Sequence, residues 1–199
     1  EPEYILNIEP YRHLQLGTKW TGVWEIDLLC DRIEMDLGNW MAVDNVFLAT
    51  CFYPSRLKGG AHKITTLFQA LDPELHQSSA EPQYDFVQCG TVGGALYEER
   101  ERLIVELRKR YSFHNFGKGF SPQEYIKNIS TARVQFIRSM KSPIGDGEIA
   151  QRFFECLGIG PVVTNYVADL HETGLTEGVD YFSYKSDGEL FDKMDILLK

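Results

Sequence analysis

The sequence lacks several features that would assign it to common functional classes. It has no stretch of about 18 consecutive apolar residues, so we expect no transmembrane helix. It has no C-x-x-C pair, and its four cysteines are scattered, which disfavours a zinc or redox site. Positive charge is also scarce, because 20 Lys and Arg stand against 29 Asp and Glu. A net charge of −9 argues against a protein that binds the nucleic-acid backbone.

The same absences suggest a cellular location. The first residues have neither a basic segment nor an apolar core of the kind a signal peptide needs. We therefore expect a cytoplasmic protein whose cysteines are buried and reduced. The five histidines are dispersed, so we predict that no metal is bound. The length of 199 residues, 43% of them apolar, suits one globular domain or one domain with a fragment of another.

From residue 84 onward, short strands alternate with amphipathic helices across glycine turns. Strands are expected at Tyr84–Cys89, Tyr111–Phe116, Arg133–Ile137, Gly160–Thr164 and Tyr181–Tyr184. Helices are expected at Leu96–Arg110, at Pro122–Ala132, in the stretch after Gly147, at Ala168–Thr173 and from Ser186 to Leu198. This alternation predicts an α/β fold with a Rossmann-like, doubly wound parallel sheet.

Before residue 84 the pattern is less regular. Strands are expected at 4–8, 20–27 and 45–50, a loop at 53–63, and a strand or short helix at 67–71. The polar segment 77–83 is typical of a linker. The sequence thus predicts a partial N-terminal α/β segment (1–76), a linker (77–83) and a larger domain (84–199).

The central stretch Gly145–Thr164 parses as a glycine turn, a helix, a second glycine turn and a strand. On a helical wheel, an apolar face opposes a stripe of Glu148, Arg152 and Glu155, which we expect to point outward from the sheet. The glycines would let an anion such as a phosphate approach the helix N-terminus. The alternative is that the stripe is a solvated ladder of ion pairs with no binding role.

Glycine and basic residues recur where the ligand of a doubly wound sheet binds, beyond the carboxyl ends of the strands. The loops expected there are Gly90–Gly94, Gly117–Phe120, Arg138–Gly147 and Thr164–Asp169, and three of these four contain glycine. Two of these loops carry a basic side chain, Lys118 in one and Arg138 in the other. This distribution favours a nucleotide diphosphate over a lone carboxylate as the ligand.

The run F-F-E-C-L-G-I-G-P-V-V-T resembles the donor-site signature of retaining GT-B glycosyltransferases, and most closely that of the spore-maturation-type subgroup. That subgroup places an acidic residue seven positions before the signature Glu and an Arg three before it, as Glu148, Arg152 and Glu155 stand here. The spacing E-x6-E is one residue shorter than the usual E-x7-E. The resemblance is good over about residues 84–198 and looser over 20–76.

The resemblance implies a domain that binds a nucleotide-sugar donor without a metal or other cofactor, in a glycosyltransferase with a glycan, lipid or protein acceptor. It assigns the ribose hydroxyls to Glu155, and the diphosphate or donor sugar to Glu148, the catalytic candidate. The remaining predicted binding residues are Gly90, Thr91, Gly117, Lys118, Arg138, Gly145, Asp146, Gly147 and Arg152, with Gly145–Gly147 holding the diphosphate and Gly117–Phe120 near the base.

Other functions are also consistent with parts of the sequence. A complete GT-B enzyme has two such domains, so the short N-terminal region predicts an incomplete acceptor side. One alternative is therefore a nucleotide or nucleotide-sugar binding module without catalysis. A Rossmann-type oxidoreductase is disfavoured, because no G-x-G-x-x-G opens the first helix of the regular part.

Overall fold

The computed structural model describes strands β1–β4 in the N-terminal part and residues 80–94, 97–138 and 149–199. The chain forms two compact units, Glu1–Gln69 with Lys141–Ile149 and Ala70–Met140 with Ala150–Lys199. The domain division predicted around 77–83 stays a prediction. Within the described residues, no helix is both long and apolar enough to cross a membrane.

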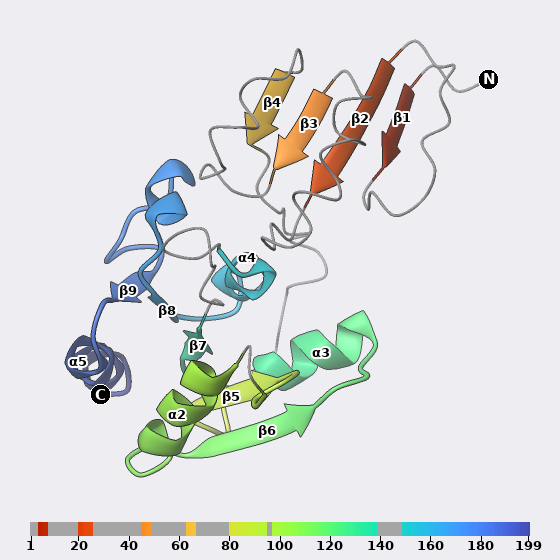
Figure 1. Cartoon of the computed structure of the whole chain (residues 1–199). Coiled ribbons are helices and arrows are strands. Elements are labelled where there is room, and N and C mark those ends of the chain that lie inside the picture. Colours follow the sequence, from red (N-terminus) through yellow and green to blue (C-terminus); the bar gives the residue numbers. More distant parts are fainter. Residues whose placement is uncertain are drawn as a thin grey trace. The chain divides into compact units, whose positions relative to one another are not determined.

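The first unit contains a sheet of four parallel strands, drawn side by side in Figure 1. They are β1 (Tyr4–Asn7), β2 (Trp20–Glu25), β3 (Asn45–Leu48) and β4 (Lys63–Thr66), paired in that order. The predicted strands at 4–8, 20–27 and 45–50 are confirmed. The loop predicted at 53–63 extends too far, since β4 begins at Lys63. Its residues Lys-Ile-Thr-Thr are mostly β-branched, which favours an extended chain.

The second unit continues the alternation of strands and helices. Its strands are β5 (Phe86–Cys89), β6 (Phe113–Gly117), β7 (Gln135–Ile137), β8 (Val162–Asn165) and β9 (Phe182–Tyr184). Its helices are α2 (Glu98–Leu107), α3 (Pro122–Ile129), α4 (Gln151–Leu157) and α5 (Asp187–Leu197), with a 3-10 helix, η2, at Ala168–Glu172.

These strands pair in parallel in two groups, β6-β5 and β7-β8-β9, and the segments just before β5 and β7 bring the groups together in the order β6-β5-β7-β8-β9. The hydrogen-bond ladder is interrupted between β5 and β7. There the backbone N–H groups of Arg133 and Val134 donate to the carbonyls of Tyr84 and Asp85, each at 2.9 Å, and Tyr84 bridges to Ala132. Numbered within this unit, the order is 2-1-3-4-5, a doubly wound arrangement whose switch point lies between its first and third strands. The predicted Rossmann-like α/β fold is confirmed.

Helices cover both faces of this sheet. On one face, the buried Leu103, Ile104 and Leu107 of α2 and Leu190 and Met194 of α5 form one core with strand residues such as Phe136. Helix α3 packs on β5, and α4 packs on β7 and β8. Their buried side chains lie outside that core, as right-handed crossovers require for helices on the opposite face.

Local signals set where the helices start. The Ser121 hydroxyl accepts from the N–H of Glu124, whose carboxylate accepts from the N–H of Ser121, so a capping box starts α3 at Pro122, where the helix was predicted to begin. At the start of α5 the Ser186 hydroxyl accepts from the Glu189 N–H, while the Glu189 carboxylate accepts from the N–H of Lys185. The central helix begins later than predicted, at Gln151, because Ala150 is extended. Glu148 therefore lies before α4.

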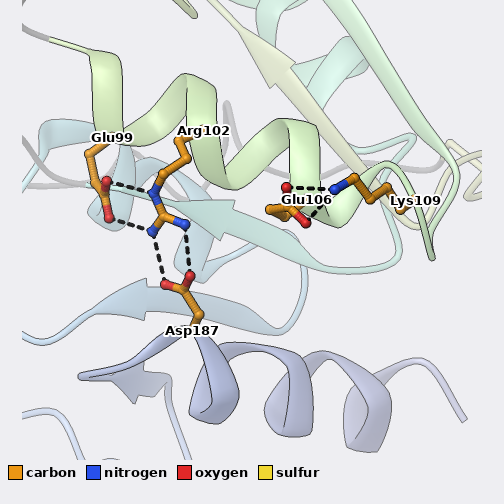
Figure 2. Close-up of polar contacts among 5 residues, drawn as sticks. All are labelled: Glu99, Arg102, Glu106, Lys109 and Asp187. Atoms are coloured by element: carbon orange, nitrogen blue, oxygen red, sulfur yellow. Dashed lines mark hydrogen bonds and ion pairs between the residues drawn. The ribbon is translucent and has the colours of Figure 1, made fainter.

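Helices α2 and α5 are joined at their N-terminal ends by one arginine. Figure 2 shows the Arg102 guanidinium between the carboxylates of Glu99 and Asp187, at 2.7 and 2.8 Å. The hydrogen bonds from Arg102 are the largest cause that lowers the pKa of both carboxyl groups. A second pair joins Glu106, near the end of α2, to Lys109 just beyond the helix.

We expect Arg102→Met to lower the free energy of unfolding by about 0.5–2 kcal/mol at neutral pH, since these groups are about half exposed and solvent screens them. Because the folded pKa values are depressed, this contribution is present above the unfolded carboxyl pKa near about 4 and is lost as pH falls through the folded values. Urea unfolding at neutral and acid pH measures it. A difference between variant and wild type that persists undiminished in acid would contradict the assignment, and Lys109→Met is the control with a smaller effect.

Candidate site at the carboxyl ends of the strands

The glycine turns after β5 and β6 lie next to each other. Gly90 follows β5 and Gly117 ends β6, and the N–H of Gly90 donates to the Gly117 carbonyl. Their φ angles are 102° and 81°, a backbone conformation that a side chain disfavours. The predicted residues Thr91 and Lys118 follow directly, and Arg138 follows β7. Since parallel strands end at the same edge, these five predicted residues lie along one edge of the sheet.

Arg152 does not point outward as predicted. Its Nη1 donates to the Cys89 carbonyl at 3.0 Å and its Nη2 to the Val87 carbonyl at 3.3 Å, both on β5. The ladder between β5 and β7 stops at Asp85, so the guanidinium binds strand carbonyls beyond that point. A helical wheel could not predict these hydrogen bonds. It assumes that all backbone carbonyls of the sheet are paired with neighbouring strands and are not free to accept from a side chain. Arg152 thus ties α4 to β5 beside the switch point.

Arg100 is a site residue that the sequence analysis missed. Its Nη1 donates to the Thr91 carbonyl at 3.0 Å and its Nη2 to the Arg138 carbonyl at 2.7 Å, so it ties the loop after β5 to the loop after β7. Burial is the largest cause that lowers its pKa, and the charges of Arg152 and Arg138 lower it further. A signal was present: Arg100 precedes the buried Leu103, Ile104 and Leu107 by three, four and seven residues, which places it on the inner face of α2.

Glu155 contacts a neighbouring helix. The Tyr125 hydroxyl of α3 donates to Glu155 Oε2 at 2.7 Å, and both side chains are partly buried. Burial raises the pKa of Tyr125, so its hydroxyl is a proton donor at neutral pH. Among the described residues this is the one hydrogen bond that the Glu155 carboxylate makes. The predicted ladder partner, Arg152, binds β5 instead.

Four predicted residues, Gly145, Asp146, Gly147 and Glu148, lie outside the described residues. Their roles, like those of the other predicted binding residues, stay predictions. Of the predicted stripe, Arg152 and Glu155 lie on α4, which begins at Gln151.

Two of the four cysteines lie among the described residues. Cys89 and Cys156 are free and buried, and burial raises the pKa of both thiols, that of Cys156 to about 11. Cys30 and Cys51 lie outside the described residues. In the part of the chain that the structure describes, no three His, Cys, Asp or Glu side chains are placed to hold a metal ion. Binding without a metal stays a prediction.

The chain was compared with known proteins. No protein-family model matches it, and no curated protein matches it in sequence. A solved structure similar to it is that of Alr3699/HepE from Anabaena in complex with UDP-glucose. The TM-score is 0.61 at 14% sequence identity, over 90% of this chain and 62% of the HepE chain. This chain therefore shares the Rossmann-like α/β fold of a protein that binds UDP-glucose.

Proposed function

We propose that this chain binds a nucleotide-diphosphate sugar at the carboxyl edge of β5, β6 and β7 and serves as the donor side of a GT-B glycosyltransferase of the spore-maturation type. The observation that carries the proposal is the grouping of Arg100, Arg138 and Arg152 at the switch point of a chain with net charge −9. Positive charge concentrated at one edge of an acidic protein favours an anionic ligand there. The UDP-glucose complex of HepE, which has a similar fold, supports a nucleotide sugar.

The proposed roles follow from the chemistry of each side chain. Glu155 accepts hydrogen bonds from the ribose hydroxyls, and the glycine turn at Gly117 with Lys118 lies beside the base. Arg138 and the segment Gly145–Gly147 bind the diphosphate. Glu148 acts near the diphosphate or the donor sugar. In this proposal Arg152 acts through its charge and by holding β5, rather than as a direct ligand.

The proposed transfer moves a glycosyl group from the donor to a glycan, lipid or protein acceptor, with retention at the sugar carbon. The bond between the sugar carbon and the diphosphate oxygen breaks, the acceptor hydroxyl bonds to that carbon and releases its proton, and the nucleoside diphosphate leaves as an anion. Arginine side chains and backbone N–H groups stabilise its developing charge without a metal. The alternative that shares this site is a binding module that holds the donor without transferring the sugar. A transfer and hydrolysis assay with UDP-glucose separates the two.

We expect calorimetric titration of the full chain to show binding of UDP and UDP-glucose. UMP should bind at least about tenfold more weakly, because it lacks the second phosphate of UDP and the charge-assisted hydrogen bonds made to that phosphate. Glu155→Gln should weaken UDP binding by roughly ten- to a hundredfold, through loss of a charged acceptor worth about 1.5–3 kcal/mol. Its melting temperature should stay close to that of the wild type.

Glu106→Gln is the matched control, because Glu106 lies near the C-terminal end of α2, away from the carboxyl edge, and pairs with Lys109. It should leave UDP affinity unchanged. Equal affinity of wild type and Glu155→Gln, with a lower melting temperature for the variant, would make the carboxylate part of a structural contact and overturn its assignment to ribose. No binding of UDP, GDP or their sugars would overturn the proposed function.

A further inference from the structure

We propose that Tyr125 is a positioning residue that orients the Glu155 carboxylate and thereby sets the preference of this site for a ribonucleotide over a 2′-deoxyribonucleotide. The inference rests on the proposed function and deepens it. It starts from the hydrogen bond of 2.7 Å between the Tyr125 hydroxyl and Glu155 Oε2, which joins α3 to α4 across residues that stand 30 positions apart.

Both ends of this hydrogen bond are held firmly. Tyr125 lies in the first turn of α3, where its N–H donates to the Ser121 carbonyl at 2.9 Å and the capping box fixes the start of the helix. Glu155 lies between Phe153 and Cys156, two fully buried residues of α4. The tyrosine hydroxyl therefore meets the carboxylate in one geometry, and little conformational entropy remains to be lost on ligand binding.

The hydrogen bond also decides which acceptor sites remain. An ionised carboxylate offers about four acceptor positions on its two oxygens. Tyr125 occupies one position on Oε2 and so fixes the plane of the group, which leaves Oε1 and the second position of Oε2 for a ligand. A ribose diol has two adjacent hydroxyl donors that suit these two oxygens. A 2′-deoxyribose lacks the 2′-hydroxyl donor, so one acceptor position of the oriented Glu155 carboxylate would have no hydrogen-bond partner.

Calorimetric titration of the full chain with UDP and with 2′-deoxy-UDP tests this inference. In the wild type we expect UDP to bind roughly ten- to a hundredfold more tightly than the deoxy compound. Tyr125→Phe should weaken UDP binding by about three- to tenfold and leave 2′-deoxy-UDP nearly unchanged, so the ratio of the two affinities falls. In Glu155→Gln, adding Tyr125→Phe should produce no further change in that ratio, because the tyrosine acts through the glutamate.

Tyr111→Phe is the matched control. Tyr111 donates to Asp195 Oδ1 at 2.5 Å, a second tyrosine–carboxylate pair, just before β6 at the opposite edge of the sheet. It should change neither affinity. If Tyr125→Phe weakens both ligands equally, or leaves the ratio as in the wild type, Tyr125 does not orient the carboxylate and the inference is overturned while the proposed function stands. If the wild type binds neither compound, GDP and 2′-deoxy-GDP take their place in the same titrations, and a wild type that binds none of the four overturns both the inference and the proposed function.

Discussion

Replacing Arg152 with methionine should lower the free energy of unfolding of the second unit by about 2–4 kcal/mol. The variant loses two hydrogen bonds from a charged donor, to the carbonyls of Val87 and Cys89, and bonds of this kind contribute about 1.5–3 kcal/mol each. The expected loss is smaller than the sum of two such bonds. The bond to Val87 is long, at 3.3 Å, and burying the charged guanidinium already costs free energy in the wild type. Helix α4 then has no guanidinium to tie it to β5, the strand on one side of the switch point.

Urea unfolding followed by far-ultraviolet circular dichroism measures this effect, since helices α2–α5 belong to that unit. Tryptophan fluorescence does not report on it, because Trp20, Trp24 and Trp40 all precede residue 80. Arg152→Lys should recover only part of the loss, because an ammonium group lacks the planar fork that spans two carbonyls.

Arg108→Met is the control for Arg152→Met. Arg108 is exposed, and its guanidinium lies over the Phe113 ring at 5.4 Å, a contact worth about 0.5–1 kcal/mol. A loss for Arg152→Met no larger than that of the control would show that the guanidinium is dispensable at the switch point.

The second large effect is expected at Phe153. Phe153→Ala should lower the free energy of unfolding by about 3–5 kcal/mol, the usual cost of removing a buried phenyl ring and leaving a cavity. The ring is completely buried and packs edge-on against Tyr181, with ring centroids 5.4 Å apart. It attaches α4, and with it Arg152 and Glu155, to the rest of the unit.

The same circular dichroism measurement applies, and Phe153→Leu should restore part of the stability because it refills most of the volume. Ile196→Ala is the control, since Ile196 on α5 is 64% exposed and should cost less than about 0.5 kcal/mol. If Phe153→Ala is as mild as this control, the ring is not part of the core that supports α4.

Local chemistry in the sequence was enough for the order of strands and helices in the second unit. The alternation of strands and helices predicted a parallel α/β sheet, and the helix expected from Pro122 begins there in α3. Such signals act between residues a few positions apart, so the sequence contains them whatever the rest of the chain does. The start of β4 at Lys63 was missed because a Gly- and Lys-rich stretch before it masks a short β-branched run.

The direction of the long polar side chains was decided by tertiary structure. The sequence alone determined that Arg152 and Glu155 share one helix, and that glycine turns and basic residues end several strands. Only the packing decided that Arg152 binds carbonyls 63 and 65 positions away, that Arg100 joins two loops, and that Tyr125 meets Glu155. A guanidinium or hydroxyl binds whichever acceptor the fold brings within about 3 Å, and no local pattern records which distant carbonyl that will be.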